Sequence, residues 1–283
     1  MDTEVDGRER LFDEYANLNN GIDRLAVVRC DVDDLGQAFI TGFSNHFNTL
    51  SRSATFSRSM SLFFKFHINQ ILNDLETSGT IIYSGGDDVF VLGNWFDMIE
   101  FAIKLREEFI DFSQGKLTLS TGIGLYPKKT PISVMASETG YLEESAKDNG
   151  KDSISLFTPE YTFKWDDFIQ NIWNGKYLLI QDFFEENRLN TEYGKSFIYN
   201  LLSLIRKSKI EIESTESERG AYKTISWARW AYYLSRLEPS EPSLKDSYRK
   251  FTRQLHTYFS NEKDVKELEV ALELFIYTIR GEE

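Results

Sequence analysis

The sequence predicts an α+β domain followed by an all-α helical domain, and three observations lead to this fold class. Short apolar runs rich in β-branched residues alternate with longer amphipathic segments up to Thr158-Pro159. Beyond that point the apolar residues recur only at helical spacing. Aromatic residues (22 Phe, 14 Tyr and 5 Trp) are abundant enough to fill a sizeable core. We therefore expect a leader over residues 1–21, a mixed domain over 22–158 and a helical domain over 159–283.

The mixed domain is expected to begin with a strand, because Leu25 to Val28 form a short, β-branched apolar run. Apolar side chains at three- and four-residue spacing mark the first long helix, whose start Thr55, Ser57 or Ser59 could cap. The expected elements are strand 24–30, helix 56–76, hairpin 80–93, helix 95–113, strand 116–125, helix 131–147 and strand 152–157. From strand 24–30 to strand 116–125 they follow the β-α-β-β-α-β order, which predicts a ferredoxin-like palm, an antiparallel sheet with helices on one face.

The helical domain carries no motif that is typical of catalysis. Its expected helices are 176–189, 193–209, 219–237, 243–260 and 264–280. Two basic clusters, Arg206-Lys207-Ser208-Lys209 and Tyr248-Arg249-Lys250, could touch RNA, although solvated helix faces are the commoner origin of such clusters. The region is therefore interpreted as a helical bundle that supports or docks other chains.

Two acidic clusters lie where strands are expected to end. In the hairpin, an apolar strand leads into Gly85-Gly86-Asp87-Asp88 and an apolar strand leaves it. Asp31 and Asp33 follow the first strand and share one face of it, because side chains alternate with a period of two. Clustered carboxylates repel one another and favour a hard cation such as Mg²⁺, although a solvated hairpin with ordinary Asp turn residues would look alike. Acids from two distant strand ends suggest a two-metal site for phosphoryl transfer.

These motifs resemble the large subunit of type III-A CRISPR effector complexes, in its second palm domain and the helical domain after it. The resemblance rests on residues 31–36, Ser57-Arg58 with Phe63-Phe64, and residues 83–95. Residues 117–124 and Leu142 to Lys147 with Gly150-Lys151 agree, so the matching motifs cover about residues 22–157. The layout is more distantly similar to GGDEF-type diguanylate cyclases and class III nucleotidyl cyclases.

The resemblance implies an ATP-dependent nucleotidyltransferase that makes cyclic oligoadenylates for antiviral defence, in a complex activated by target RNA. Asp31, the Val32 carbonyl and Asp87 would hold two Mg²⁺ (or Mn²⁺) ions, with Asp88 in support. Asp33 would be either a third metal ligand or a residue that supports the ligands without binding the metal. Nucleotide contacts would come from Ser84, Gly85, Gly86, Ser57, Ser120, Lys147 and Lys151. For Ser57 and Ser120, a helix cap and a core-strand hydroxyl are equally good interpretations.

The sequence also departs from that family. The family's nuclease domain of the HD type, its first palm and its zinc-site cysteines have no counterpart here. His46, His67 and His256 are scattered and none is followed by Asp. Because two palms face each other in the family, we expect this chain to need a second palm, from an N-terminal fragment or a second copy. Other implied partners are a small helical subunit on the C-terminal domain, and guide and target RNA through the complex.

Two other functions stay open. One is a different purine cyclase, making a cyclic dinucleotide or mononucleotide with the same metal chemistry. The other is a non-enzymatic scaffold that only senses nucleotide, although a scaffold has no need to bear the repulsion of clustered carboxylates.

Composition limits where and how the chain acts. A net charge of −13 argues against a free-standing nucleic-acid binder that relies on bulk attraction. Cys30, the only cysteine, lies in an expected buried strand and cannot form an internal disulfide or a structural zinc site. Residues 1–20 are polar and acidic, and no apolar run approaches the roughly 20 residues of a membrane span. We therefore expect a cytoplasmic protein without a membrane partner.

Overall fold

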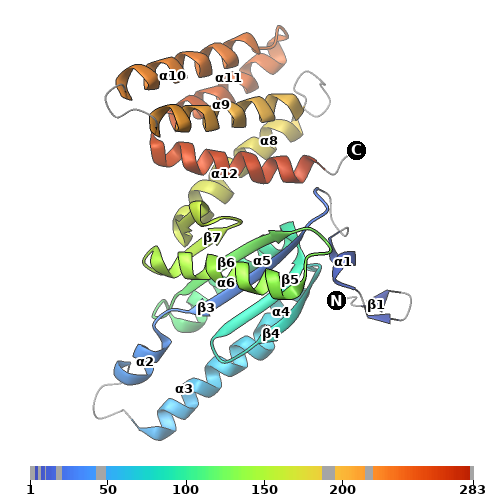
Figure 1. Ribbon diagram of the computed structural model, residues 1–283, viewed down its shortest axis with the longest axis vertical. Coiled ribbons are helices and arrows are strands. Elements are labelled where there is room, and N and C mark those ends of the chain that lie inside the picture. Colours follow the sequence, from blue (N-terminus) through green and yellow to red (C-terminus); the bar gives the residue numbers. More distant parts are fainter. Residues whose placement is uncertain are drawn as a thin grey trace. The chain divides into compact units, whose positions relative to one another are not determined.

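The computed structural model describes residues 4–5, 8–9, 11–16, 21–42, 49–186, 195–213 and 219–280. The chain divides into two compact units, Met1–Trp165 and Asp166–Glu283. The first is a mixed sheet with helices and the second is helical, which confirms the predicted fold class (Figure 1). His46 lies outside the described residues.

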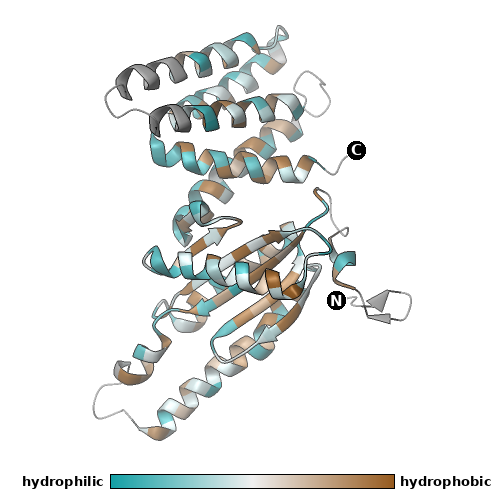
Figure 2. Ribbon diagram, viewed as in Figure 1, coloured by the Kyte–Doolittle hydropathy of each residue, from teal (hydrophilic) through white to brown (hydrophobic). Residues whose placement is uncertain are grey.

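A six-stranded sheet forms the frame of the first unit, in the order β4-β5-β3-β6-β7-β8. Its strands are β3 (Leu25–Val32), β4 (Gly79–Ser84), β5 (Asp88–Asn94), β6 (Leu119–Tyr126), β7 (Ser153–Leu156) and β8 (Thr162–Lys164). The central strand β3 pairs antiparallel with β5 and β6, and β6 pairs parallel with β7. Figure 2 shows that β3 and β5 carry mostly apolar residues, as central strands should.

The long helices of this unit follow the predicted order. Its helices are α1 (Phe12–Tyr15), α2 (Leu35–Thr41), α3 (Leu50–Leu62), α4 (Ile68–Asp74), α5 (Trp95–Ser113) and α6 (Ile132–Asp148). The short α7 (Trp165–Asp167) begins at the last residue of this unit. A π-helical turn, Phe63–His67, joins α3 to α4. The first long helix therefore begins at Leu50, and the predicted caps Thr55, Ser57 and Ser59 are wrong because all three lie inside α3. The apolar face begins later in the chain than the helix itself, so the spacing of the apolar residues predicted a helix start that is too late.

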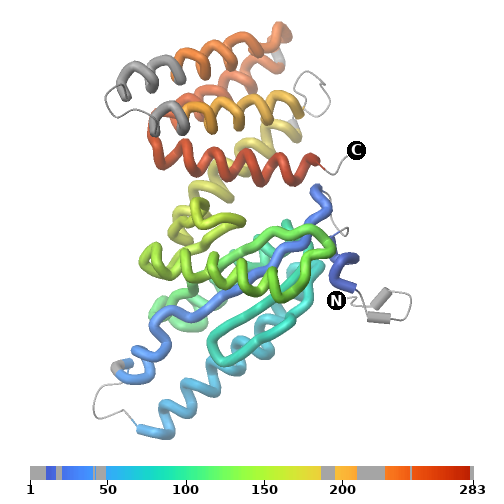
Figure 3. Tube along the Cα trace, in the orientation of Figure 1, coloured from blue at the N-terminus to red at the C-terminus, as the bar shows by residue number. Residues whose placement is uncertain are grey.

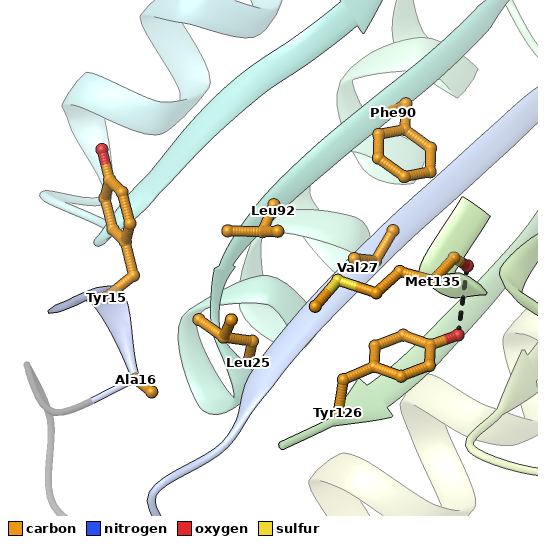
Figure 4. Close-up of a cluster of buried hydrophobic side chains, with 8 residues drawn as sticks. All are labelled: Tyr15, Ala16, Leu25, Val27, Phe90, Leu92, Tyr126 and Met135. Atoms are coloured by element: carbon orange, nitrogen blue, oxygen red, sulfur yellow. Dashed lines mark hydrogen bonds between the residues drawn. The ribbon is translucent and has the colours of Figure 1, made fainter. Parts of the chain in front are cut away.

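Helices cover both faces of the sheet, which corrects the expectation of helices on one face. Leu25 and Val27 pack in a buried cluster with Met135 of α6 (Figure 4). Ala26 points the other way and pairs with Gly93, where a Cβ would lie 2.8 Å from the Met98 side chain of α5. The physical reason is the parallel β6–β7 pair, which needs a crossover helix (Figure 3).

Two further segments join the sheet domain against expectation. Tyr15 and Ala16, in the expected leader, are buried in the same cluster as Leu25 and Leu92. Strand β8 pairs antiparallel with β7, although its residues lie within the range expected for the helical domain. A strand of three residues is too short to show a period of two. The short strands β1 (Glu4–Val5) and β2 (Arg8–Glu9) form a separate hairpin.

The second unit is a bundle of helices, as predicted. A π-helical segment, Phe168–Tyr177, leads into α8 (Leu178–Glu186), α9 (Lys195–Glu213), α10 (Arg219–Arg236), α11 (Pro242–Tyr258) and α12 (Glu262–Ile279). Within it, the buried Lys176 ammonium lies 2.7 Å from Glu267 and 2.9 Å from Asp264. None of the helices in the described part of the chain is both long and apolar enough to span a membrane.

One arginine of each basic cluster in this unit is held by ion pairs within the bundle. Arg206 lies 3.1 Å from both Glu269 and Glu273, and Arg249 lies 2.5 Å from Glu238. Tyr248 is buried and donates a hydrogen bond to the Leu234 carbonyl. These contacts favour structural helix faces over an RNA-binding surface.

Candidate active site

The two acidic clusters meet on adjacent central strands. Asp31 of β3 and Asp88 of β5 are direct partners in the antiparallel register. The Val32 N–H donates to the Asp87 carbonyl at 3.1 Å, which ties the end of β3 to the hairpin turn. Residues more than fifty positions apart in the sequence thus lie side by side at one end of the sheet.

The carboxylates at this end of the sheet repel one another. Burial and the nearby charges of Asp31 and Asp88 raise the pKa of Asp87, against the opposing effect of Lys147. Among the described residues, no three acidic, His or Cys side chains are already gathered around a metal position. The donor set nevertheless fits Mg²⁺, because carboxylate oxygens are its usual ligands and a cation would relieve this repulsion.

Lys147 supplies the positive charge in the present arrangement. Its ammonium lies 2.7 Å from Asp31 Oδ2 and 2.6 Å from Glu143 Oε1. Burial alone would lower the pKa of Lys147, but its hydrogen bonds to Asp31 and Glu143 raise it overall. Lys147 is about a third exposed, at 34%, so it remains accessible to a phosphate.

A glycine on β6 brings Lys147 to this position. A Cβ at Gly122 would lie 2.5 Å from the Glu143 backbone nitrogen and 2.7 Å from the Thr139 carbonyl oxygen. Only glycine therefore lets α6 approach the sheet so closely. Tyr126 also holds α6 against the sheet, because its hydroxyl donates to the Met135 carbonyl (Figure 4). The same hydroxyl lies 2.8 Å from the Thr139 hydroxyl.

We expect Gly122→Ala to lower the free energy of unfolding by about 1–3 kcal/mol, because the new methyl group meets helix backbone rather than a movable side chain. Urea unfolding of the whole chain measures this. Gly36→Ala is the matched control, since a Cβ there meets nothing within 4 Å. Equal stability of Gly122→Ala and the wild type would show that α6 does not rely on the glycine.

Asp33 lies in the interior, behind the cluster. It is 4% exposed, and its carboxylate accepts hydrogen bonds from Ser120 Oγ at 2.6 Å and Thr118 Oγ1 at 2.7 Å. It also accepts from the Asp152 N–H at 3.0 Å. Ser120 is fully buried against Asp33, so this arrangement favours the core-hydroxyl interpretation of Ser120 over a sugar contact.

The predicted nucleotide-binding residues of the hairpin differ in their surroundings. A Cβ at Gly85 would lie 2.7 Å from Asp88 Oδ1, whereas one at Gly86 would meet nothing within 4 Å. The Ser84 hydroxyl donates to the Phe64 carbonyl in the π-helical turn, so it ties the hairpin to that helix. Ser57 is exposed on α3. A side chain at Gly85 would therefore displace the Tyr83 and Asp88 side chains, whereas one at Gly86 would displace nothing.

Lys151 is held in a left-handed turn. Gly150, Lys151 and Asp152 have φ angles of 83°, 62° and 42°, a costly backbone for the latter two. Asp33 accepts from the Asp152 N–H, and Lys164 donates to the Gly150 and Lys151 carbonyls. The Lys151 ammonium pairs with Asp34, so it lies beside the acidic end of β3 without contacting Asp31.

Sequence reasoning missed Arg29, Gly122, Thr118 and Glu143. Their signals were present but weak: Glu143 and Lys147 have the i,i+4 spacing of a helix pair, and Arg29 shares a strand face with Asp31. Such patterns are common on exposed surfaces. Only the packing of α6 shows that these groups belong to the site.

The sheet order and the acids at the end of its central strand and in the neighbouring hairpin define a palm-domain protein. Residues 24–155 match the family model of the Cas10/Cmr2 second palm domain. Residues 181–281 match that of the CRISPR RNA silencing complex Cmr2 subunit, second helical domain. The chain belongs to the Cas10/Cmr2 family, as the sequence motifs predicted.

Curated relatives agree. The chain is 52% identical over 278 residues to the CRISPR system single-strand-specific deoxyribonuclease Cas10/Csm1 (subtype III-A) of Streptococcus thermophilus, covering 94% of this chain and 35% of the relative. It is 45% identical over 289 residues to the protein of the same description from Mycobacterium tuberculosis, covering 96% and 34%. The chain thus spans about a third of the length of these relatives.

Solved structures share the fold. A Csm1–Csm4 cassette in complex with cA4 matches with a TM-score of 0.71 at 22% identity, covering 98% of this chain and 40% of that chain. A Csm1–Csm4 cassette in complex with one ATP also matches with a TM-score of 0.71 at 22% identity, covering 98% and 39%. Csm1 of T. onnurineus matches with a TM-score of 0.70 at 24% identity, covering 98% and 40%.

Proposed function

We propose that this chain is the nucleotide-condensing part of a type III-A CRISPR effector subunit, which makes cyclic oligoadenylates from ATP. The observation that carries the proposal is the pairing of Asp31 with Asp88 beside Asp87, whose pKa is raised by burial and by these neighbours. Carboxylates kept together at such a cost are typical of functional sites rather than of structural turns. The complexes of related Csm1–Csm4 cassettes with ATP and cA4 support the choice of substrate and product.

In this proposal Asp31, the Val32 carbonyl and Asp87 hold Mg²⁺ or Mn²⁺, with Asp88 in support. When bound, the ions would lower the pKa of a ribose 3′-hydroxyl and stabilise negative charge on the phosphates. The hydroxyl oxygen forms a bond to the α-phosphorus of a second ATP, and the bond to pyrophosphate breaks. Lys147 and Lys151 neutralise triphosphate charge, and the exposed Gly86 lets the backbone approach the nucleotide.

We further propose that a second palm completes the site, supplied by an N-terminal fragment or a second copy. The relatives are about three times as long as the stretch that matches this chain, which leaves room for such a palm in them. Csm4-like and small helical CRISPR subunits, with guide and target RNA, are the remaining proposed partners, on the analogy of the Csm1–Csm4 cassettes. A cytoplasmic location follows from this assignment.

A deoxyribonuclease activity, which the names of the curated relatives state, finds no support in the residues of this chain. None of its three histidines is followed by Asp, so it lacks an HD-type dyad. The favoured alternatives remain another purine cyclase with the same acids, or a nucleotide-sensing scaffold.

Product identification by mass spectrometry separates these functions. The chain is incubated with ATP or GTP and Mg²⁺ or Mn²⁺, with and without a fragment that carries a second palm and with and without target RNA. We expect cyclic oligoadenylates only when the second palm is present. A cyclic dinucleotide or mononucleotide would favour the other cyclase. Bound ATP without pyrophosphate release in every mixture would overturn the synthetase proposal in favour of the scaffold.

A further inference from the structure

We propose that Glu143 is a positioning residue for nucleotide binding, which holds the Lys147 ammonium where a triphosphate can reach it. The inference rests on the proposed function, since it concerns how the same site binds ATP. Glu143 touches neither Asp87 nor Asp88 in the structure, so it acts through Lys147.

Glu143 is the buried centre of a chain of alternating charges. Its Oε2 lies 2.6 Å from Arg29 Nε, and its Oε1 lies 2.6 Å from Lys147 Nζ. Lys147 in turn lies 2.7 Å from Asp31. Arg29 and Asp31 share one face of β3, while Glu143 and Lys147 stand one turn apart on α6. Each residue of the strand pair therefore meets an opposite charge on the helix, Arg29 at Glu143 and Asp31 at Lys147.

The burial of Glu143 argues for a specific role. Its side chain is 7% exposed, whereas those of Arg29 and Lys147 are 37% and 34% exposed. A buried carboxylate loses its hydration, and the attraction of nearby cations has to offset that loss. An ion pair at the surface would carry a smaller desolvation cost. Gly122 has no side chain, which lets the Glu143 backbone approach β6. The close approach of α6 to β6 thus sets where the Glu143 carboxylate lies, and its ion pair with Lys147 limits where the lysine can move.

This role predicts an effect opposite in sign to simple electrostatics. ATP carries a strongly negative triphosphate, so removing a nearby negative charge should by itself tighten its binding. If Glu143 instead positions Lys147, its removal leaves Asp31 as the carboxylate that holds the ammonium, which draws the lysine away from the triphosphate, and ATP binding weakens. The direction of the change in ATP affinity therefore decides between simple electrostatics and positioning of Lys147.

The test is calorimetric binding of a non-hydrolysable ATP analogue with Mg²⁺ to the full chain, with any second palm that the wild type needs to bind. We expect Glu143→Gln to weaken binding about tenfold, as loss of a supporting partner does elsewhere. Glu144→Gln is the matched control, because it removes the same charge from the exposed neighbour on α6. It should change binding less than twofold. Unchanged or tighter binding by Glu143→Gln overturns the proposal.

A double-mutant cycle separates positioning from a general loss of structure. In a Lys147→Met background, Glu143→Gln should have no further effect on nucleotide affinity. An equal tenfold loss in that background would show that Glu143 acts on the fold alone and would overturn the proposal. The wild type serves as the check on the underlying function: a wild type that binds no nucleotide contradicts the proposed function itself, whereas binding that is indifferent to Glu143 contradicts only this inference.

Discussion

Asp87→Asn is expected to lower the rate of nucleotide condensation by more than about 100-fold, since even residues that only support metal ligands cost 10–100-fold. The same change should leave the chain at least as stable as the wild type in the absence of metal. Burial and the charges of Asp31 and Asp88 raise the pKa of Asp87, so its ionised form is unfavourable in the folded state. A neutral amide removes that repulsion and keeps the shape.

The measurement pairs product formation with urea unfolding of the same preparation. Asp74→Asn is the matched control, because it removes one carboxylate from an exposed position at the end of α4. We expect the control to leave both quantities unchanged. If Asp87→Asn retains activity within a few fold, Asp87 is not a metal ligand and the turn is the solvated hairpin that the sequence also allowed.

Local patterns in the sequence predicted most elements of the sheet domain. Helix α5 spans Trp95–Ser113, as its apolar spacing indicated, and the hairpin of β4 and β5 surrounds the two glycines as expected. The adjacency of Asp31 and Asp88 also follows, because a β-α-β-β order places the first strand beside the third. These features depend on residues close in sequence or on a known topology.

Contacts between distant segments could not be predicted in this way. Burial of Tyr15, pairing of β8 with β7 and the placement of α6 depend on tertiary packing. The Glu143–Lys147 spacing is what an exposed helix pair also shows, and only the close approach at Gly122 turns it into part of the site. The burial of Cys30 could be predicted, because it lies in an apolar strand. This burial raises the pKa of its thiol to about 12.

The sequence left Asp33 with two roles, as a metal ligand or as a support behind the ligands, and the structure makes the second role testable. Its carboxylate accepts three hydrogen bonds, from Ser120, Thr118 and the Asp152 N–H. Asp33→Ala would leave these donors without this acceptor, Ser120 in the interior and the other two half-buried. A fully buried unsatisfied donor costs about 1–3 kcal/mol and a half-buried one costs less, so we expect the free energy of unfolding to fall by about 2 kcal/mol or more.

Urea unfolding at fixed pH measures the loss, and Asp34→Asn is its control, because Asn tolerates the left-handed φ of 55° at this position as Asp does. Asp34 is the next carboxylate in the chain, but its side chain is 60% exposed, and within the described residues its ion pair is with Lys151 at the surface. Such pairs contribute about 0–1 kcal/mol, so the control should be nearly as stable as the wild type. If Asp33→Ala instead keeps its stability and loses only Mg²⁺ affinity, Asp33 is a metal ligand. If the two variants lose equal stability, the three hydrogen bonds do not hold the left-handed turn in place, and Lys151 must be positioned in another way.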